Sequence, residues 1–164
     1  MRTALADAIR KAYTCETQLF EEQANERSVL FHVGRYLATE VETWDADLTV
    51  DLEYNRHHLP ASSIRNPKRL PQRAGSVSLV YPDLIVHNRS GSTTDHNLLV
   101  LEAKHNPSPE GRDRDYRKLQ AFRQYFHYRH AVFLELPPGG AKPLWQWFTD
   151  QNIDSRRLRL FPVF

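Results

Sequence analysis

The sequence predicts an α/β fold, in which helices flank a sheet. Apolar residues recur at helical spacing in two stretches near the amino end, residues 3–22 and 25–42. Uniformly apolar runs at 84–86 and 98–101 are typical of strands that are buried on both faces. A further amphipathic helix and a short apolar strand follow them. This alternation of helices and strands in one chain predicts the α/β class.

Length and composition favour a single enzyme-sized domain, residues 1–164. No linker or repeat divides the chain, and a hydrophobic content of 40% argues against disorder. No apolar run approaches the length of a membrane span, and residues 1–7 lack the apolar stretch of a signal peptide, so we expect a cytoplasmic protein with no membrane partner. The single cysteine, Cys15, excludes an internal disulfide and a multi-cysteine zinc site.

The second expected helix, residues 25–42, has a carboxylate on its apolar side. Glu26 precedes Val29, Leu30 and Val33 by three, four and seven positions, so it shares their face. A carboxylate on a face that packs against a sheet is costly without a partner or a function. Glu26 is therefore a candidate site residue.

An expected strand, residues 47–55, is followed by a basic stretch. The strand has polar residues on one face, namely Asp51, Glu53 and Asn55. Residues 56–73 contain no Asp or Glu, and their cations are candidates for contacts with nucleic-acid phosphates: Arg56, Arg65, Lys68, Arg69 and Arg73. A solvated loop is the alternative, because several prolines interrupt the stretch. For any single arginine both interpretations stay open.

Two later strands, residues 81–87 and 97–104, form a predicted hairpin. The segment between them contains Ser90-Gly91-Ser92, which is typical of a hairpin loop. If the hairpin closes symmetrically, Leu84 faces Leu101. This register determines which charged side chains meet at the open end.

The register brings two carboxylates and an amine together. Asp83 lies opposite Glu102, and Lys104 shares the face of Glu102 because side chains alternate along a strand. Two acids beside a lysine are typical of a metal-assisted hydrolytic site. The alternative is a structural ion-pair cluster, since a bare Glu-x-Lys is common. We favour the catalytic interpretation, because charges that leave a buried strand are costly without a partner or a task.

The remaining elements complete the domain. A helix begins near Asp113 and carries Lys118 beside its apolar stripe, and a strand covers residues 131–136. The aromatic tail after it is expected to add edge strands or a closing flap, with its rings used for packing. None of the eight histidines has the close spacing of a metal-ligand pair.

Five motifs lie, in order, on the first five elements of the series helix, strand, strand, strand, helix, strand. They are Asn25-Glu26-Arg27, Glu53-Tyr54-Asn55-Arg56, Pro82 through His87, Glu102-Ala103-Lys104 and Asp115-Tyr116-Arg117-Lys118-Leu119. With these motifs the chain resembles the restriction-endonuclease-like nucleases of the PD-(D/E)XK superfamily, and small prokaryotic members in particular. The resemblance implies a restriction-endonuclease-like core over about residues 25–136, with a mixed central β-sheet flanked by helices in αβββαβ order. An N-terminal helix and a C-terminal aromatic extension would complete it.

The resemblance also implies a role for each site residue. Asp83, Glu102 and the backbone carbonyl of Ala103 would bind a divalent metal, with Glu26 reaching it directly or through water. Oxygen ligands of this kind favour Mg2+ or Mn2+ over zinc. Lys104 would orient the attacking water and stabilise the transition state.

The expected function is metal-dependent hydrolysis of phosphodiester bonds in nucleic acid, with DNA as the favoured substrate. Lys118, on the helix after the site, is a lesser candidate for phosphate contact. One alternative is a catalytically inactive nuclease fold that binds nucleic acid. Another is a regulatory subunit of a defence or repair assembly, and a homodimer is also left open.

Overall fold

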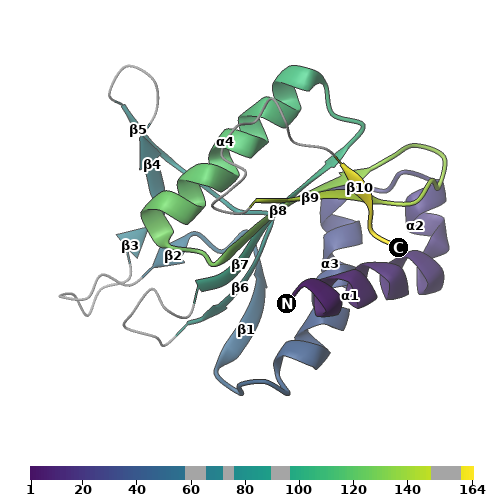
Figure 1. The fold of residues 1–164 in the computed structure, drawn as a ribbon, viewed down its shortest axis with the longest axis horizontal. Helices are drawn as coiled ribbons and strands as arrows, with labels where there is room; N and C mark the ends of the chain where they lie inside the picture. Colours follow the sequence, from purple (N-terminus) through teal and green to yellow (C-terminus); the bar gives the residue numbers. More distant parts are fainter. Residues whose placement is uncertain (58–65, 72–75, 90–96, 149–159) are drawn as a thin grey trace.

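The computed structural model describes residues 1–57, 66–71, 76–89, 97–148 and 160–164, which form a mixed α/β structure (Figure 1). The helices in these ranges are α1 (Arg2–Cys15), α2 (Thr17–Glu21), α3 (Glu26–Val41) and α4 (Pro109–Phe126). One sheet contains, in spatial order, β1 (Leu48–Leu52), β6 (Leu84–Asn88), β7 (Asn97–His105), β8 (His130–Leu136), β9 (Leu144–Phe148) and β10 (Phe161–Pro162). Two short ribbons pair β2 (Arg56–His57) with β3 (Asn66–Pro67), and β4 (Arg69–Pro71) with β5 (Val77–Leu79).

The sheet is mixed and has helices on both faces. Strands β7 and β8 are parallel, because α4 carries the chain back between them, whereas the other described pairs of this sheet are antiparallel. Helices α1 and α3 cover one face, and α4 covers the other (Figure 1). The predicted α/β class with a central mixed sheet is thus confirmed. Among the described helices, none is long and apolar enough to cross a membrane.

The first helical stretch is interrupted, and the second begins where its cap predicts. The expected single helix over residues 3–22 divides at Glu16, whose ψ of 41° departs from helical geometry. Helix α3 begins at Glu26 because the side chain of Asn25 accepts a hydrogen bond from the Ser28 amide at 2.9 Å. Gly34 of α3 faces the sheet, where a Cβ would lie in van der Waals contact with Leu84, at 3.4 Å.

The β6–β7 hairpin has the predicted register. Leu84 pairs with Leu101 and Ile85 with Val100, as symmetric closure requires. The pairing shifts by one residue after Val86, so the symmetry does not continue towards the loop. The end that carries the charged residues is therefore aligned as expected.

The strand expected over residues 47–55 is shorter than predicted. It ends at Leu52 because Glu53 has a φ of 51°, a left-handed conformation that breaks the extended backbone. The shared polar face of Asp51, Glu53 and Asn55 therefore does not form. The loop alternative for the following basic stretch does not hold for its described parts, which contribute strands β2, β3 and β4.

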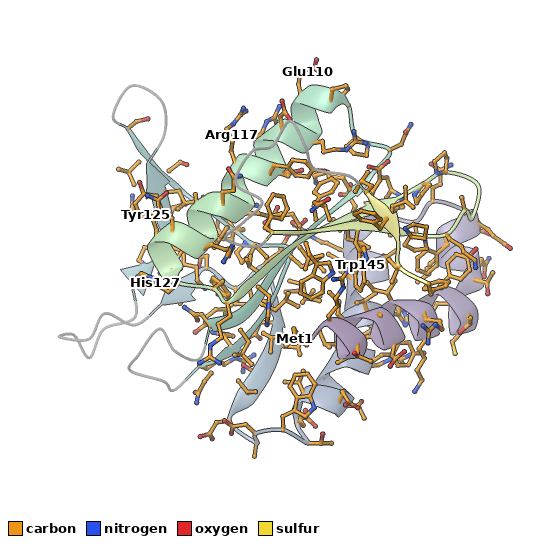
Figure 2. The ribbon with its side chains drawn as sticks, viewed as in Figure 1. Met1, Glu110, Arg117, Tyr125, His127 and Trp145 are labelled. Atoms are coloured by element: carbon orange, nitrogen blue, oxygen red, sulfur yellow. The ribbon has the colours of Figure 1, made fainter. Side chains whose placement is uncertain are left out.

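Two hydrophobic cores hold the layers together. Leu5 and Ile9 of α1 and Leu37 of α3 are fully buried against one face of the sheet. Figure 2 shows Trp145 between the sheet and α1, where it is buried with Trp147. On the other face, residues of α4 pack on β7, β8 and β9; among them are Tyr116, Leu119 and Phe122. The described tail thus adds edge strands whose tryptophans are packed inside.

Candidate active site

Strand β7 extends past the residue at which β6 begins. Beyond that point, the edge of β7 that faces β6 can contact side chains. The last paired residues are Leu84 and Leu101, whereas β7 continues to His105. The Ala103 amide donates a hydrogen bond of 2.8 Å to Oδ2 of Asp83, the residue just before β6. The same edge presents the His105 amide, which donates to Oε1 of Glu26 at 3.1 Å. Backbone amides of β7 therefore hold two of the predicted carboxylates.

The carbonyl of Ala103 lies on the same edge. In an extended strand the N–H and C=O of one residue point to the same side, and the Ala103 N–H points to Asp83. The side chain of Ala103 is buried in the core on the α3 side. The backbone oxygen expected among the metal ligands is thus on the edge of β7 that faces Asp83.

Glu26 links the start of α3 to Lys104. Its Oε2 lies 3.5 Å from the Lys104 ammonium, and about a third of its side chain is exposed. The His105 ring contacts the Ala24 carbonyl at 2.7 Å, which fixes the chain just before α3 to the end of β7. The structure thus brings the predicted helix carboxylate next to the predicted lysine.

Glu102 is a buried carboxylate with one unpaired oxygen. Its exposed fraction is 1%, and its Oε2 accepts a hydrogen bond of 2.7 Å from Lys118 of α4. Its Oε1 is buried and has no hydrogen-bond partner among the described residues. Burial, together with the charge of Asp83, raises the pKa of Glu102 to about 8. A cation at Oε1 would provide the missing partner and replace the proton.

Asp115 is a further carboxylate of this site, although the sequence alone indicated no role for it. It is buried on α4, three residues before Lys118 and therefore on the same side of the helix. Burial raises its pKa, and the charges of Lys104 and Lys118 oppose this effect. The Asp-x-x-Lys spacing was the available signal, since it places both groups on the face that packs on β7.

Negative charge exceeds positive charge at the site. Burial lowers the pKa of Lys104, but the charges of four carboxylates outweigh it and raise the pKa overall; these are Asp83, Glu26, Asp115 and Glu102. Lys118 is the second ammonium that interacts with this group. When every group is ionised, four carboxylates face two lysine ammonium groups and the charge of Arg114 beside Asp115, so negative charge stays in excess, which suits a divalent cation.

A cavity of about 200 Å³ opens beside the site. Its lining combines residues of α3 with residues at the ends of β1, β6 and β7: Glu26, Arg27, Leu30, Leu52, Glu53, Asp83 and Lys104. Arg27 and Glu53 form an exposed ion pair at 2.6 Å. Glu102 is absent from the lining, so the cavity gives access from the side of Asp83 and Lys104. Its volume is enough for several water molecules.

The donors at this site are oxygen atoms, the type that Mg2+ prefers. Among the described residues, no three His, Cys, Asp or Glu side chains form a group that could hold a metal. Asp83 and Glu102 supply two carboxylates, and the Ala103 carbonyl lies on the facing strand edge. Mg2+ is usually bound by only one or two carboxylates and keeps several of its waters. The observation that favours such an ion here is Oε1 of Glu102, for which the described residues offer no partner.

The predicted phosphate-binding residues differ in their placement. Arg56 and Arg69 are exposed on the short ribbons, whereas Arg65 and Arg73 lie outside the described residues. Lys118 is not a free surface cation, because it donates hydrogen bonds of 2.7 Å to Glu102 and to the Tyr81 carbonyl. Its position ties it to the carboxylate site.

Lys68 lies in the interior, contrary to its expected surface role. Only 1% of it is exposed, so it cannot reach a phosphate in solvent. Its ammonium donates to the Tyr54 carbonyl at 3.1 Å and lies near the rings of Tyr54 and Tyr128. Burial lowers its pKa to about 7, although the charge of Asp51 acts in the opposite direction.

Asp51 belongs to a separate polar cluster. Its carboxylate contacts Nε2 of His87 at 2.8 Å and accepts hydrogen bonds from Arg89. Burial raises the pKa of Asp51, but these hydrogen bonds outweigh it and lower the pKa overall. The cluster joins β1 to β6 and to Arg89, the residue just after β6. These contacts explain why Asp51 and His87 are buried.

Comparisons with known proteins assign no family to the chain. No family model matches it, and no curated protein matches it. A solved structure described as the crystal structure of SSO0001 superposes with a TM-score of 0.30 at 13% sequence identity. The alignment covers 98% of this chain and 64% of that one, so the chain spans less than two thirds of the length of SSO0001. A likeness this low carries no argument about fold family or function.

Proposed function

We propose that this protein is a metal-dependent nuclease that hydrolyses phosphodiester bonds, with DNA as its substrate and a restriction-endonuclease-like core. The observation that carries the proposal is the buried Oε1 of Glu102, which has no partner within the described part of the chain and lies in a site that also holds Asp83 and Lys104. The resemblance of the motifs to the PD-(D/E)XK superfamily supports the same conclusion. A structural ion-pair cluster would explain Lys118 on Glu102, but none of the described residues would then be a partner for Oε1.

The ligands of the metal would come from the β6–β7 hairpin. Asp83, Glu102 and the Ala103 carbonyl would hold Mg2+ or Mn2+, and Glu26 would act through water because its Oε1 already binds the His105 amide. When bound, the ion would polarise the scissile phosphate and stabilise the leaving oxygen. The cavity lined by Asp83 and Glu26 gives room for water beside these groups.

Lys104 would act as a cation rather than as a base. The surrounding carboxylates raise its pKa, so its amine stays protonated near neutral pH. A protonated amine can donate hydrogen bonds to the attacking water and to the phosphate oxygens as charge develops on them. Glu26, 3.5 Å away, holds the amine on the side of the cavity.

Residues of α4 would fix the ligand geometry. Lys118 holds Oε2 of Glu102, which directs Oε1 away from this ammonium. Asp115 adds negative charge beside both lysines. Arg56 and Arg69 are the exposed cations of the ribbons that would meet the substrate backbone.

A cleavage assay tests the proposal directly. The full chain is incubated with linear, circular, single-stranded and branched DNA and with RNA, in Mg2+, Mn2+ or EDTA. We expect cleavage of DNA only with a metal, loss of cleavage in Asp83→Asn and Glu102→Gln, and unchanged cleavage in Lys142→Ala, an exposed lysine before β9. Absence of metal-dependent cleavage on every substrate would contradict the proposal, and binding without cleavage would then favour a nucleic-acid-binding module.

A further inference from the structure

An exposed apolar stripe lies along β5 and the residues after it. Val77, Leu79 and Tyr81 are exposed by 54%, 45% and 49%, whereas Val80 between them is buried at 8%. Alternation along the extended chain therefore turns these three side chains to solvent on one face. Large apolar side chains that lie together in an exposed row mark a candidate interaction surface. We call these three residues the β5 stripe.

The β5 stripe ends at the proposed catalytic site. The Lys118 ammonium donates hydrogen bonds of 2.7 Å both to the Tyr81 carbonyl and to Oε2 of Glu102. Asp83 follows Tyr81 by two residues. A molecule that lies on the stripe is thus next to the carboxylates at its Tyr81 end.

Positive charge flanks the stripe. Arg69 pairs with Leu79 across the β4–β5 ribbon and is exposed. Helix α4 contacts β4, and Figure 2 shows Arg117 projecting from α4 on the side of β4 and β5. Residues 54–82 contain no Asp or Glu, so the ribbon segment itself offers no negative charge.

We infer that the β5 stripe binds unpaired bases of a nucleic-acid strand, with Tyr81 stacked on a base next to the reacting phosphate. Aromatic and apolar side chains bind bases through their flat faces, which are hidden in a duplex but available in a single strand. Arg69 and Arg117 provide charge for the phosphates of the same strand. The position of the reacting phosphate rests on the proposed function, whereas base binding does not. The preferred substrate is therefore single-stranded DNA or a frayed end.

Fluorescence of a base analogue tests the stacking. A single-stranded DNA oligonucleotide with 2-aminopurine is titrated with the full chain in EDTA, where no cleavage occurs. We expect quenching on binding, a Kd that is about 5- to 100-fold weaker for Tyr81→Leu, and near wild-type behaviour for Tyr81→Phe, which keeps the ring. Trp44→Leu is the matched control, because Trp44 is 43% exposed and follows the far end of α3. An unchanged Kd and quench in Tyr81→Leu would overturn the inference.

Two further measurements distinguish base stacking from duplex binding and from dimer formation. A blunt duplex of the same sequence is expected to bind equally well to wild type and Tyr81→Leu, since it offers no base faces. A stripe that instead joins two copies of the chain would change the molar mass in light scattering for Tyr81→Leu without changing DNA binding, which overturns the inference. Tyr81-dependent binding without any cleavage supports the stripe while the proposed function fails. If wild type and Tyr81→Leu cleave single strands equally well, the proposed function is supported and the inference about the stripe is overturned.

Discussion

The ammonium of Lys118 on α4 lies 2.7 Å from Oε2 of the buried Glu102 on β7. Glu102 is 1% exposed, and its other carboxylate oxygen has no hydrogen-bond partner among the described residues. A buried carboxylate that loses its cation is left with an uncompensated charge, unless it takes up a proton or another cation. The pair therefore determines how stability and metal binding depend on pH.

Replacing Lys118 with Met is expected to destabilise the fold mainly at high pH. The pKa of Glu102 is raised to about 8, so the folded protein holds this proton at pH 6 and loses it at pH 9. Without the ammonium, Glu102 keeps its proton above pH 8, so the loss of stability at pH 9 exceeds the loss at pH 6 by up to about 1.4 kcal/mol, the value of one pH unit above the pKa of about 8. Urea denaturation at both pH values measures the difference, with Lys142→Met as control. Equal losses of unfolding free energy at both pH values would contradict the raised pKa of Glu102.

Metal affinity is expected to increase with pH up to about 8. Between the ordinary carboxyl pKa of 4.5 and the raised value of about 8, folded Glu102 carries a proton that a cation must displace. The apparent affinity for Mn2+ should therefore rise by up to about tenfold per pH unit in this range and level off above it. Titrations of Mn2+ by electron paramagnetic resonance at pH 6 to 9 measure this. Glu102→Gln should lose this dependence of Mn2+ affinity on pH. An identical slope of affinity against pH in that variant would refute the prediction.

Lys104→Ala separates chemistry from binding. The substitution removes a cation that acts on the attacking water and the transition state but leaves both metal carboxylates, so cleavage should fall by about 10²- to 10⁴-fold. The Kd for DNA in EDTA should change by less than about tenfold. Single-turnover cleavage and fluorescence anisotropy measure the two effects. A variant that binds poorly but cleaves normally at saturating DNA would place Lys104 in substrate binding.

Glu26→Gln is expected to weaken metal-dependent activity without unfolding the protein. Glutamine can still accept a hydrogen bond from the His105 amide, so the link between α3 and β7 remains. The negative charge 3.5 Å from Lys104 is lost, which removes the proposed water-mediated help to the metal. We expect the Mg2+ concentration at half-maximal cleavage to rise several-fold, with little change in Tm. Full activity across the Mg2+ titration would assign Glu26 to structure alone.

Local patterns predicted the part of the site that lies on one hairpin. The apolar runs of β6 and β7 are buried on both faces, so only one register keeps their charged ends together, and Leu84 indeed pairs with Leu101. The hydrogen bond from the Ala103 amide to Asp83 follows from this register. The place of Glu26 on the apolar side of α3 indicated that its carboxylate approaches the site, where it lies beside Lys104.

Other features depend on contacts between residues far apart in the chain. Glu53 ends β1 in a left-handed conformation although no glycine or asparagine marks that position. Lys68 is buried because Tyr54 and Tyr128 close over it, and its sequence neighbours are typical of a surface loop. Asp51 is hydrogen-bonded to His87 on the opposite strand and ion-paired with Arg89, which follows that strand. Sequence patterns indicate the spacing of hydrophobic residues along the chain, but they do not indicate which distant residues come into contact.

Lys68→Met tests the interior position of this lysine through its pH dependence. The folded protein releases the Lys68 proton near pH 7, whereas the unfolded chain keeps it up to about its ordinary pKa of 10.5. Between these values the unfolded state binds more protons, so the contribution of Lys68 to stability rises with pH. The difference in unfolding free energy between wild type and variant should therefore change by a few kcal/mol between pH 7 and 10.

The control for this variant is an exposed cation of the same region. Arg69→Gln should leave the pH profile of stability unchanged but reduce DNA affinity and its salt dependence, because Arg69 is exposed. Lys68→Met should do the opposite and leave DNA affinity close to wild type, because only 1% of Lys68 is exposed. Thermal and urea unfolding measure stability, and anisotropy at several salt concentrations measures binding. Parallel stability profiles for wild type and Lys68→Met, together with weakened DNA binding, would place Lys68 at the surface instead.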